Sequence, residues 1–209
     1  MDLIKKIDEM IEERSLLKHP FYQTWSDGKL TKEALAGYSK EYFQLVKQVP
    51  AFMTPIIEQS PDEFVKELTE NQQEESEHIR PWISFASELG ISENELMSYS
   101  GLPKTQQAVS DLSELMSDFE SGSCAMYAFE KEIPKISQTK LDGLAQFYGM
   151  TSQEATEYFK LHTEADIRHA ASWRKIIQNS LANDKLIEVA DKSISAQNLL
   201  LDSCFEKYC

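Results

Sequence analysis

The sequence predicts an all-helical fold, a bundle whose helices are joined by short connections. Glycine and proline number only 7 each among 209 residues, and all-β folds use more turn residues than that. Apolar residues recur at spacings of three and four, as they do along the buried face of a helix. Residue patterns that cap helices are frequent, and no segment shows a convincing alternation with the period of a strand.

In the first part of the chain we expect helices at 2–17, 31–48, 50–59 and 61–79. Thr31 is placed to cap the second of these helices. Ser60 and Glu63 have the spacing of a capping box for the fourth. Pro81 cannot donate a hydrogen bond to the carbonyl of Glu77, so it should kink or end that helix.

The remaining helices are expected at 81–89, 92–99, 104–119, 122–147 with a bend near Pro134, 151–179 and 184–206. Ser92 and Thr151 open two further capping boxes, and Gly90 and Gly149 are expected helix stops. Residues from about 180 onward form either a terminal helix or a tail. We treat 1–209 as one domain, since this length suits a single full-sized core.

Composition and charge exclude several classes of function. The net charge of −14 disfavours nucleic acid and anionic membranes, because binding to phosphates needs a basic surface. No apolar run approaches the roughly 18 residues that cross a bilayer, and the N-terminal residues lack the apolar stretch of a signal peptide. The odd number of cysteines fits the reduced thiols of a cytoplasmic protein; they are Cys124, Cys204 and Cys209.

The predicted helix 151–179 carries polar residues on its apolar stripe. His162, Asp166 and His169 are separated by four and three residues, so their side chains stack along about two turns of the buried face. Burying three titratable groups is costly unless each finds a partner. A divalent metal would satisfy them, and so would a hydrogen-bonded His–Asp–His network; this helix alone leaves both open.

Two other predicted helices favour the metal. His78 follows Glu75 by three residues and Glu74 by four, and Glu-x-x-His is a familiar arrangement in di-metal carboxylate bundles. Glu130 lies among apolar neighbours, although by itself it would be interpreted as an ordinary exposed glutamate. Three carboxylates and three imidazoles suffice for two ions, and these donors suit iron or manganese. The candidate ligands are Glu75, His78, Glu130, His162, Asp166 and His169.

At these residues the sequence resembles the heme-oxygenase-like helical fold shared by TenA, PqqC and the heme-oxygenase-like di-metal oxidases. The likeness extends to the relatives of the Chlamydia protein associating with death domains and covers about residues 3–178. His-x3-Asp-x2-His after a Tyr-Phe pair is its most specific motif. The segments that carry it are HPFYQTWSDGKLTKEAL, YSKEYF, FEKEIPKI with LDGLAQFYGM, and YFKLHTEADIRHA.

The resemblance implies a set of metal ligands. Those that match residue by residue are Glu130, His162, Asp166 and His169. For the first pair, relatives of the chlamydial protein space Glu and His seven apart, whereas the fatty-acid decarboxylase branch uses the shorter spacing of Glu75 and His78. We therefore expect Glu75 as the ligand, with Glu74 as its substitute.

The implied reaction is the synthesis of para-aminobenzoate without an external aromatic substrate. Enzymes of this kind oxidise one of their own tyrosines with O2 at two divalent ions, Fe2+ or Mn2+, and excise its ring. The matching tyrosine is Tyr22, the matching amine donor is Lys140, and Tyr158 matches a tyrosine near the site. Phe129 stands where relatives can carry another tyrosine. An external reductant, either a protein or a small molecule, and a homodimer are also implied.

Other interpretations compete with this one. Without the resemblance, Tyr22 would be a packing aromatic and Lys140 a surface lysine. A di-metal oxidase could act on an external fatty acid or amino acid and would need neither residue. A TenA-type thiaminase would use Cys124, which lies six residues before Glu130. A non-enzymatic interaction module would need no metal.

Overall fold

Residues 2–209, which the computed structural model describes, are arranged in helices, with no strand among them. A short 3₁₀ helix, Leu16–Lys18, follows the first α-helix. The α-helices are α1 (Leu3–Glu13), α2 (Pro20–Ser26), α3 (Lys32–Val46), α4 (Val49–Glu58), α5 (Asp62–Glu88), α6 (Glu93–Ser98), α7 (Pro103–Leu115), α8 (Phe119–Glu130), α9 (Ile133–Phe147), α10 (Gln153–His162), α11 (Ala165–Ile177) and α12 (Asn183–Tyr208). The predicted all-helical class is confirmed.

Prolines account for two differences from the predicted elements. Pro20 begins α2, a helix that the sequence did not predict, and the His19 ring caps it by accepting a hydrogen bond from the Phe21 amide at 3.1 Å. Helix α5 continues through Pro81, so the two helices predicted on either side of it are one. Fully buried Trp82 anchors the turn after the proline, and such packing offsets the roughly 3 kcal/mol that an internal proline costs.

Helix caps agree with the predictions in part. Ser92 caps α6, but α10 is capped by Ser152 rather than by Thr151. Ser60 caps nothing and donates its hydroxyl to a carbonyl of the preceding helix. The cap and helix stops predicted at Thr31, Gly90 and Gly149 are present.

Two long predicted helices are each divided. The segment predicted as one bent helix separates into α8 and α9 just before Pro134, and the next separates into α10 and α11. Glu130 is the last residue of α8 and His162 is the last residue of α10. Both interruptions therefore adjoin predicted ligands.

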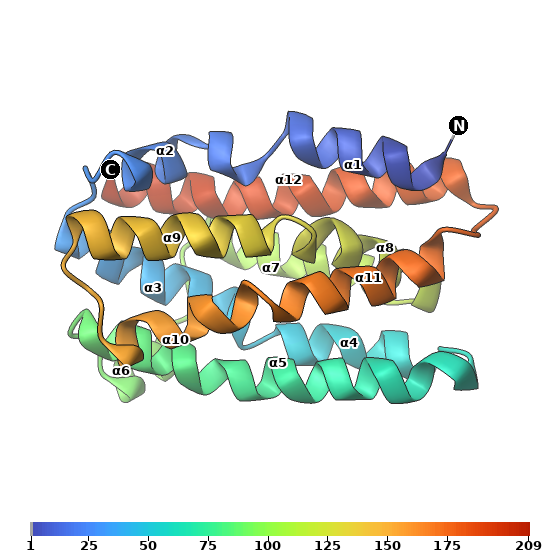
Figure 1. Ribbon diagram of the computed structural model, residues 1–209, viewed down its shortest axis with the longest axis horizontal. Helices are drawn as coiled ribbons and strands as arrows, with labels where there is room; N and C mark the ends of the chain where they lie inside the picture. The colour runs from blue at the N-terminus through green and yellow to red at the C-terminus, as the bar shows by residue number, and fades with distance from the viewer. Residues whose placement is uncertain (1) are drawn as a thin grey trace.

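The helices pack in layers (Figure 1). Helix α12 runs along one edge beside α1 and α2 and packs on α3, α7 and α8. Helix α5 lies along the opposite edge, with α4 and α10 against it. Helices α8, α9 and α11 lie between these edges, and the two termini lie at opposite ends of the α1–α12 layer. The middle of this arrangement is where α5, α8, α10 and α11 approach one another.

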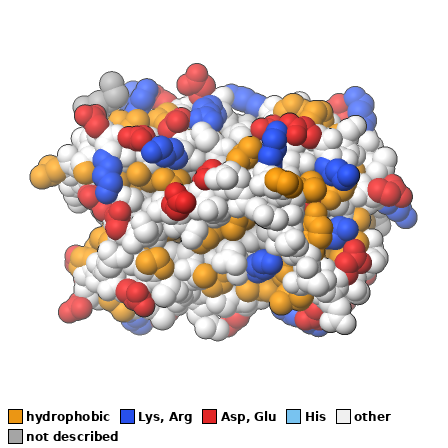
Figure 2. Space-filling model, turned by 180° about the vertical axis from the view of Figure 1, so that it is seen from behind, with side chains coloured by type: hydrophobic (Ala, Val, Ile, Leu, Met, Phe, Trp, Pro, Cys, Tyr) orange, Lys and Arg blue, Asp and Glu red, His pale blue; other side chains and the backbone are white. Residues whose placement is uncertain are grey.

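The acidic character of the chain is not gathered on the face opposite to that of Figure 1. There, acidic and basic side chains are interspersed with small apolar areas (Figure 2). None of the helices described combines the length and apolar character needed to cross a membrane.

Candidate metal centre

The six predicted ligands meet in the core of the bundle. Their side chains come from four helices, and none is more than 6% exposed. They are Glu75 and His78 of α5, Glu130 of α8, His162 of α10, and Asp166 and His169 of α11. Residues up to 94 positions apart in the sequence are thus brought to one place, since the first is Glu75 and the last is His169.

The six side chains form two groups that share one carboxylate. Within each group, the possible ligand atoms lie within 4.8 Å of one another. The groups are Glu75, His78 and His162, and Glu75, Glu130, Asp166 and His169. Glu75 lies between them, with Oε2 at 3.8 Å from Nε2 of His162 and Oε1 at 3.2 Å from Nδ1 of His169. A carboxylate placed in this way can bridge two ions.

The interruption between α10 and α11 positions His162 and Asp166. The sequence predicts one continuous helix here, and that prediction is wrong although the stretch holds no proline or glycine. Thr163 donates its hydroxyl to the carbonyl of Lys160 at 2.7 Å, and the His162 ring lies 2.7 Å from the carbonyl of Tyr158. Side-chain groups thus engage carbonyls of the last turn of α10, where the backbone amides of Thr163 and Glu164 also bond carbonyls three residues back, those of Lys160 and Leu161.

Outer hydrogen bonds orient two of the imidazoles. When Nδ1–H of His162 donates to the Tyr158 carbonyl, Nε2 presents its lone pair toward Glu75. When Nε2–H of His169 donates to Glu74 Oε2 at 3.1 Å, Nδ1 presents its lone pair toward Glu75. Ligand histidines are commonly fixed in this way, because the outer bond sets both the tautomer and the ring orientation.

The structure distinguishes the two adjacent glutamates. Glu75 is buried and belongs to both groups of possible ligands. Glu74 is half-buried, and both its oxygens are bound by Arg168, at 3.2 and 2.8 Å. Glu75 is therefore the candidate ligand, and Glu74 supports His169 from outside the group.

Trp173 is a member of the site that the sequence did not reveal. Trp173 lies on the apolar stripe of the predicted helix 151–179, where a tryptophan is expected to pack, yet its indole N–H donates to Glu130 Oε2 at 2.6 Å. The signal was present, because Trp173 follows His169 by four residues and so shares its face. The bond fixes the carboxylate of Glu130 at the end of α8.

Burial shifts the protonation of the site. It raises the pKa of Glu130 to about 8, and together with the charges of Glu130 and Glu75 it raises the pKa of Asp166 well above its usual range. Burial opposes ionisation of Glu75 as well, but the three imidazoles beside it, those of His162, His169 and His78, hold its pKa well below the usual value. Burial lowers the pKa of His169, and the surrounding carboxylates outweigh it, so the pKa rises to about 9.

The donor set fits a divalent metal. Four buried atoms of the site have no hydrogen-bond partner within the described chain: Oε1 of Glu75, Nδ1 of His78, Oδ2 of Asp166 and Nδ1 of His169. Leaving a buried polar atom unpaired costs about 1–3 kcal/mol, so four of them together at one point indicate that a ligand completes the site. Carboxylate and imidazole donors are those that iron and manganese use.

A small apolar cavity adjoins the site on one side. Its volume is about 10 Å³, which is close to the space that one water molecule needs. Tyr42 and Tyr158 line it together with members of the site. The rest of its wall is apolar and consists of Leu45, Val46, Val49, Phe129 and Ile133.

Tyr22 and Lys140 lie together in a second buried cluster. Lys140 is 3% exposed and Tyr22 is 1% exposed, so the interpretation of Lys140 as a surface lysine is wrong. The Lys140 amine donates to the hydroxyl of Tyr38 at 2.6 Å, and the hydroxyls of Tyr38 and Tyr22 are 3.2 Å apart. The amine lies 5.2 Å from the ring centre of Tyr22. Burial lowers the pKa of Lys140 to about 7.

Aromatic rings connect the two clusters. The ring of Tyr158 stacks on His162 with centroids 4.1 Å apart, and it meets Trp82 edge-to-face at 4.6 Å. Trp82 stacks on Tyr42 at 5.0 Å, and the Lys140 amine lies 4.7 Å from the centre of that ring. Tyr158, predicted near the site, is thus in contact with a candidate ligand.

Cys124, the residue that a thiaminase would use, lies outside the site, and so does His19, the one histidine that is not a candidate ligand. The Cys124 thiol is buried and donates to the carbonyl of Leu186 at 3.2 Å, and burial raises its pKa to about 12. A thiol so hard to ionise is poorly suited to be the nucleophile of a thiaminase. His19 caps α2, and its ring lies 3.0 Å from Asp202 Oδ1.

Comparison with protein-family models finds one match, over residues 36–198, to a family described as iron-containing redox enzyme. Curated relatives are similar over nearly the whole chain. A protein of Nitrosomonas europaea named 4-aminobenzoate synthase is 34% identical, with 98% of this chain and 92% of the relative covered. A protein of the same name from Chlamydia trachomatis is 31% identical, with coverage of 98% and 90%.

Solved structures of similar fold include a TenA homologue from Pseudomonas syringae, with a TM-score of 0.84 at 18% identity over 98% of this chain and 91% of that one. A CADD-like protein of unknown function from Nostoc punctiforme has a TM-score of 0.76 at 18% identity, with coverage of 99% and 97%. At these identities the likeness shows the fold, and it confirms the heme-oxygenase-like architecture expected from the sequence motifs.

Proposed function

The chain belongs to the family of iron-containing redox enzymes, and from that premise we propose that it is an O2-dependent 4-aminobenzoate synthase that takes the aromatic ring from its own Tyr22. One observation carries the proposal: the amine of Lys140 lies 5.2 Å from the ring centre of Tyr22, and both residues are buried in the same cluster. The ring and the nitrogen of the product are therefore already adjacent in the fold.

The metal centre in this proposal is dinuclear. Glu75 would bridge the two ions, with His78 and His162 on one side and the other carboxylates and His169 on the other. Bound iron, or iron together with manganese, supplies the activation of O2 that an oxidation of this kind needs. The buried candidate ligands would hold the ions away from solvent and would balance their charge, since three of them are carboxylates.

Lys140 is prepared to act as an amine. Because burial lowers its pKa to about 7, a large fraction of the side chain is uncharged near neutral pH and has a lone pair on Nζ. The Tyr38 hydroxyl, 2.6 Å from Nζ, fixes where that nitrogen lies. Tyr38 also holds the hydroxyl of Tyr22, so a single residue positions both reaction partners.

The rings between the clusters provide a path for electrons. Tyr158, Trp82 and Tyr42 are in successive contact from His162 to the neighbourhood of Lys140. Removal of electrons from Tyr22 therefore does not require Tyr22 to touch the metal centre. Phe129 lines the apolar cavity but is not part of this run of rings.

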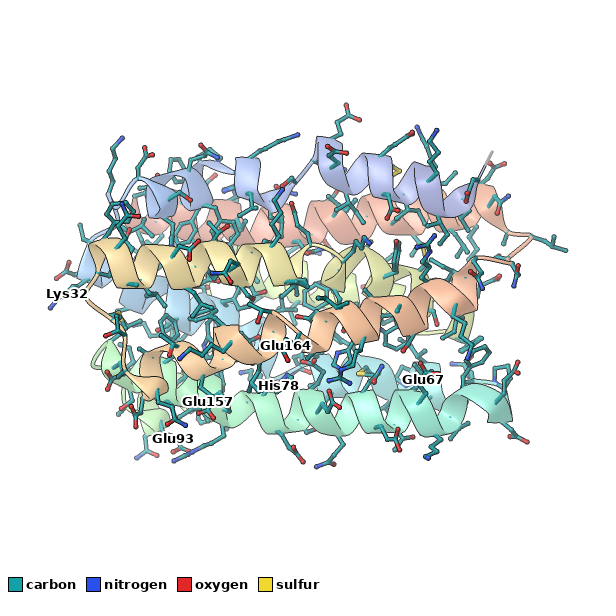
Figure 3. All side chains as sticks on the ribbon, in the orientation of Figure 1. Lys32, Glu67, His78, Glu93, Glu157 and Glu164 are labelled. Atoms are coloured by element: carbon teal, nitrogen blue, oxygen red, sulfur yellow. The ribbon has the colours of Figure 1, made fainter. Side chains whose placement is uncertain are left out.

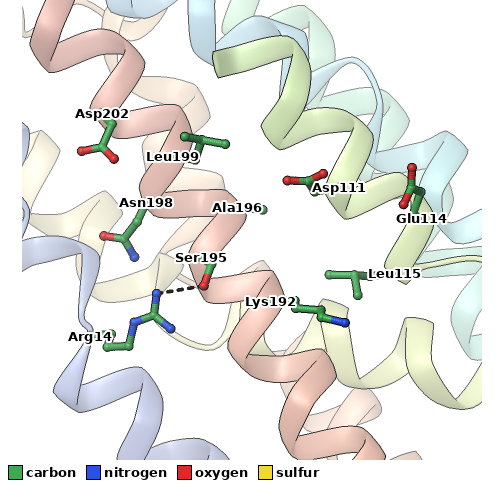
Figure 4. Close-up of a pocket in the computed structure, with 10 residues that line it drawn as sticks. All are labelled: Arg14, Asp111, Glu114, Leu115, Lys192, Ser195, Ala196, Asn198, Leu199 and Asp202. Carbon is green, nitrogen blue, oxygen red and sulfur yellow. Dashed lines mark hydrogen bonds between the residues drawn. The ribbon is translucent and has the colours of Figure 1, made fainter. Parts of the chain in front are cut away.

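The cavities of the protein favour an internal substrate. The space beside the candidate ligands is about 10 Å³, whereas pockets for small molecules usually measure roughly 300–1,000 Å³. A larger groove of about 790 Å³ lies between α7, α12 and the end of α1 (Figure 4), but none of the six candidate ligands lines it. A fatty acid or an amino acid in that groove would not reach the metal centre. A groove of about 670 Å³ does reach the candidate ligand His78, but its lining is mainly charged and includes four carboxylates, which suits neither an acyl chain nor the carboxylate of such a substrate.

The proposal is tested by isotope labelling. Protein grown with ring-13C tyrosine is loaded with iron and manganese, given a reductant and O2, and analysed for 4-aminobenzoate by mass spectrometry. We expect fully ring-labelled product, a mass loss in the peptide containing Tyr22, and no product from Tyr22→Phe. Tyr127→Phe, at a buried tyrosine outside both clusters, should retain product formation.

Two results would contradict the proposal. The first is unlabelled 4-aminobenzoate from labelled protein, which would show that the ring comes from an added substrate. The second is an intact Tyr22 peptide after reaction with every combination of the two metals.

A further inference from the structure

A surface groove of about 670 Å³ runs between α5 and the α10–α11 segment. Its charged lining is mainly acidic: four carboxylates, Glu74, Glu77, Glu157 and Glu164, face Lys160 and Arg168. Arg168 is paired with Glu74. Among residues 2–209, no cationic group lies within 4 Å of the carboxylates of Glu77, Glu157 and Glu164. The Lys160 amine likewise has no acidic partner within that distance.

His78 connects this groove with the metal centre. It lines the groove, and it also belongs to the group formed with Glu75 and His162. Its side chain is 6% exposed and makes no hydrogen bond to any described residue, although Nδ1 is 3.4 Å from Glu75 Oε1. Figure 3 shows His78, Glu157 and Glu164 in the space between α5 and the α10–α11 segment. A buried, unpartnered imidazole at the base of an acidic groove is a feature that a cation would satisfy.

The two sides of the metal centre differ in character. The cavity on the other side has a wall of aliphatic and aromatic side chains, and moving a hydrated dication through such a wall carries a large desolvation cost. The groove instead is lined by four carboxylates together with His78. The polar side thus suits a divalent cation, and the apolar side suits a small neutral molecule.

We propose that the acidic groove between α5 and α10–α11 is the route by which divalent cations reach the metal centre, with Glu77, Glu157 and Glu164 capturing the hydrated ion and His78 receiving it. The proposal rests on the metal centre described under the proposed function. Lys160, the unpaired cation of the lining, opposes the approach of the ion. Surface charges act on association rates more than on final occupancy, so the groove governs how fast the protein loads.

The test measures the loading rate of metal-free protein with Mn2+ alone. The second-order rate constant is followed by tryptophan fluorescence in a stopped-flow instrument, because Trp173 bonds a candidate ligand. Final occupancy is measured from the loss of the electron paramagnetic resonance signal of free Mn2+. The groove variant is Glu77→Gln/Glu157→Gln, and the control Glu13→Gln/Glu58→Gln removes the same charge from exposed glutamates that form no ion pair among the described residues.

At low ionic strength we expect the groove variant to load roughly fivefold more slowly than the control and to reach the same final occupancy. Lys160→Gln should load faster than wild type, a result that a folding defect would not produce. The differences should largely disappear at about 1 M salt, where charges are screened beyond about 3 Å.

Three outcomes would overturn the proposal. Equal rates for groove and control variants would show that cations enter elsewhere. A lower final occupancy in the groove variant would make its carboxylates ligands rather than a route. Failure of the wild-type protein to bind Mn2+ or Fe2+ at all would refute the metal centre itself, and so is distinct from the first two.

Discussion

Replacing Lys140 by methionine should make the protein more stable, because a buried amine opposes folding. The pKa of Lys140 falls from 10.5 to about 7 on burial. Each unit corresponds to about 1.4 kcal/mol, so keeping the amine uncharged costs about 4 kcal/mol at pH 7. Loss of the 2.6 Å bond to Tyr38 destabilises the variant by about 1 kcal/mol, so the free energy of unfolding should rise by about 3 kcal/mol for Lys140→Met.

The sign of the pH dependence follows from the lowered pKa. Below pH 7 the lysine is charged in both the folded and the unfolded chain, and the free-energy cost of burying it is greatest. Between pH 7 and 10.5 the unfolded chain binds a proton that the folded chain does not, so wild-type stability rises with pH. The advantage of Lys140→Met should therefore fall from about 3 kcal/mol at pH 7 to about 1 kcal/mol at pH 9.

The assay is urea unfolding of metal-free protein at both pH values. Lys135→Met on the same helix is the control, because Lys135 is exposed and should change stability by less than about 0.5 kcal/mol. A Lys140→Met variant less stable than wild type at pH 7, or a gain that does not change with pH, would refute the reasoning that the amine is buried and uncharged.

Three further predictions concern the metal centre and use Mn2+ titration. Glu75→Gln should abolish binding of both ions, because both groups of candidate ligands share this carboxylate. Glu74→Gln should weaken binding roughly 10- to 100-fold, because Glu74 only supports His169. Equal effects of the two substitutions would contradict the assignment of Glu75 as the ligand. The affinity for Mn2+ should rise more than tenfold from pH 6 to pH 8, and binding should release protons. The reason is that Glu130 and His169, with pKa values of about 8 and 9, must lose protons to bind a cation. An affinity that does not change with pH would exclude them as ligands. Trp173→Phe removes the bond to Glu130 and should weaken binding about tenfold with the fold intact, and an unchanged affinity would make that bond irrelevant to the metal.

The sequence was informative about helices and about ligands that lie on one helical face. The spacing of His162, Asp166 and His169 identified a buried polar stripe, and the structure brings all three together. The break between α10 and α11 was not predicted, because no proline or glycine marks it. Side-chain bonds from Thr163 and His162 to carbonyls of α10 accompany the break, and helix periodicity does not report such bonds.

Contacts between helices were harder to predict. Whether Glu74 or Glu75 faces the site depends on the rotation of α5, which one helix alone does not fix, and Arg168 of α11 settles it by pairing with Glu74. The burial of Lys140 was not predicted, because lysine side chains are usually exposed. Its position four residues after Ile136 places it on the buried face of α9, and that spacing was a usable signal.

The packing of Tyr22 has a consequence for the lifetime of each molecule. Its ring is 1% exposed and contacts those of Phe21 and Tyr38, with centroids 5.7 and 6.5 Å away. Excision of that ring would leave a void at the base of α2, and removing a large buried side chain commonly costs about 3–5 kcal/mol out of a total stability of about 5–15. A copy that has reacted would therefore unfold more readily and be more open to proteolysis than an unreacted one, so the step that forms the product also shortens the life of its source.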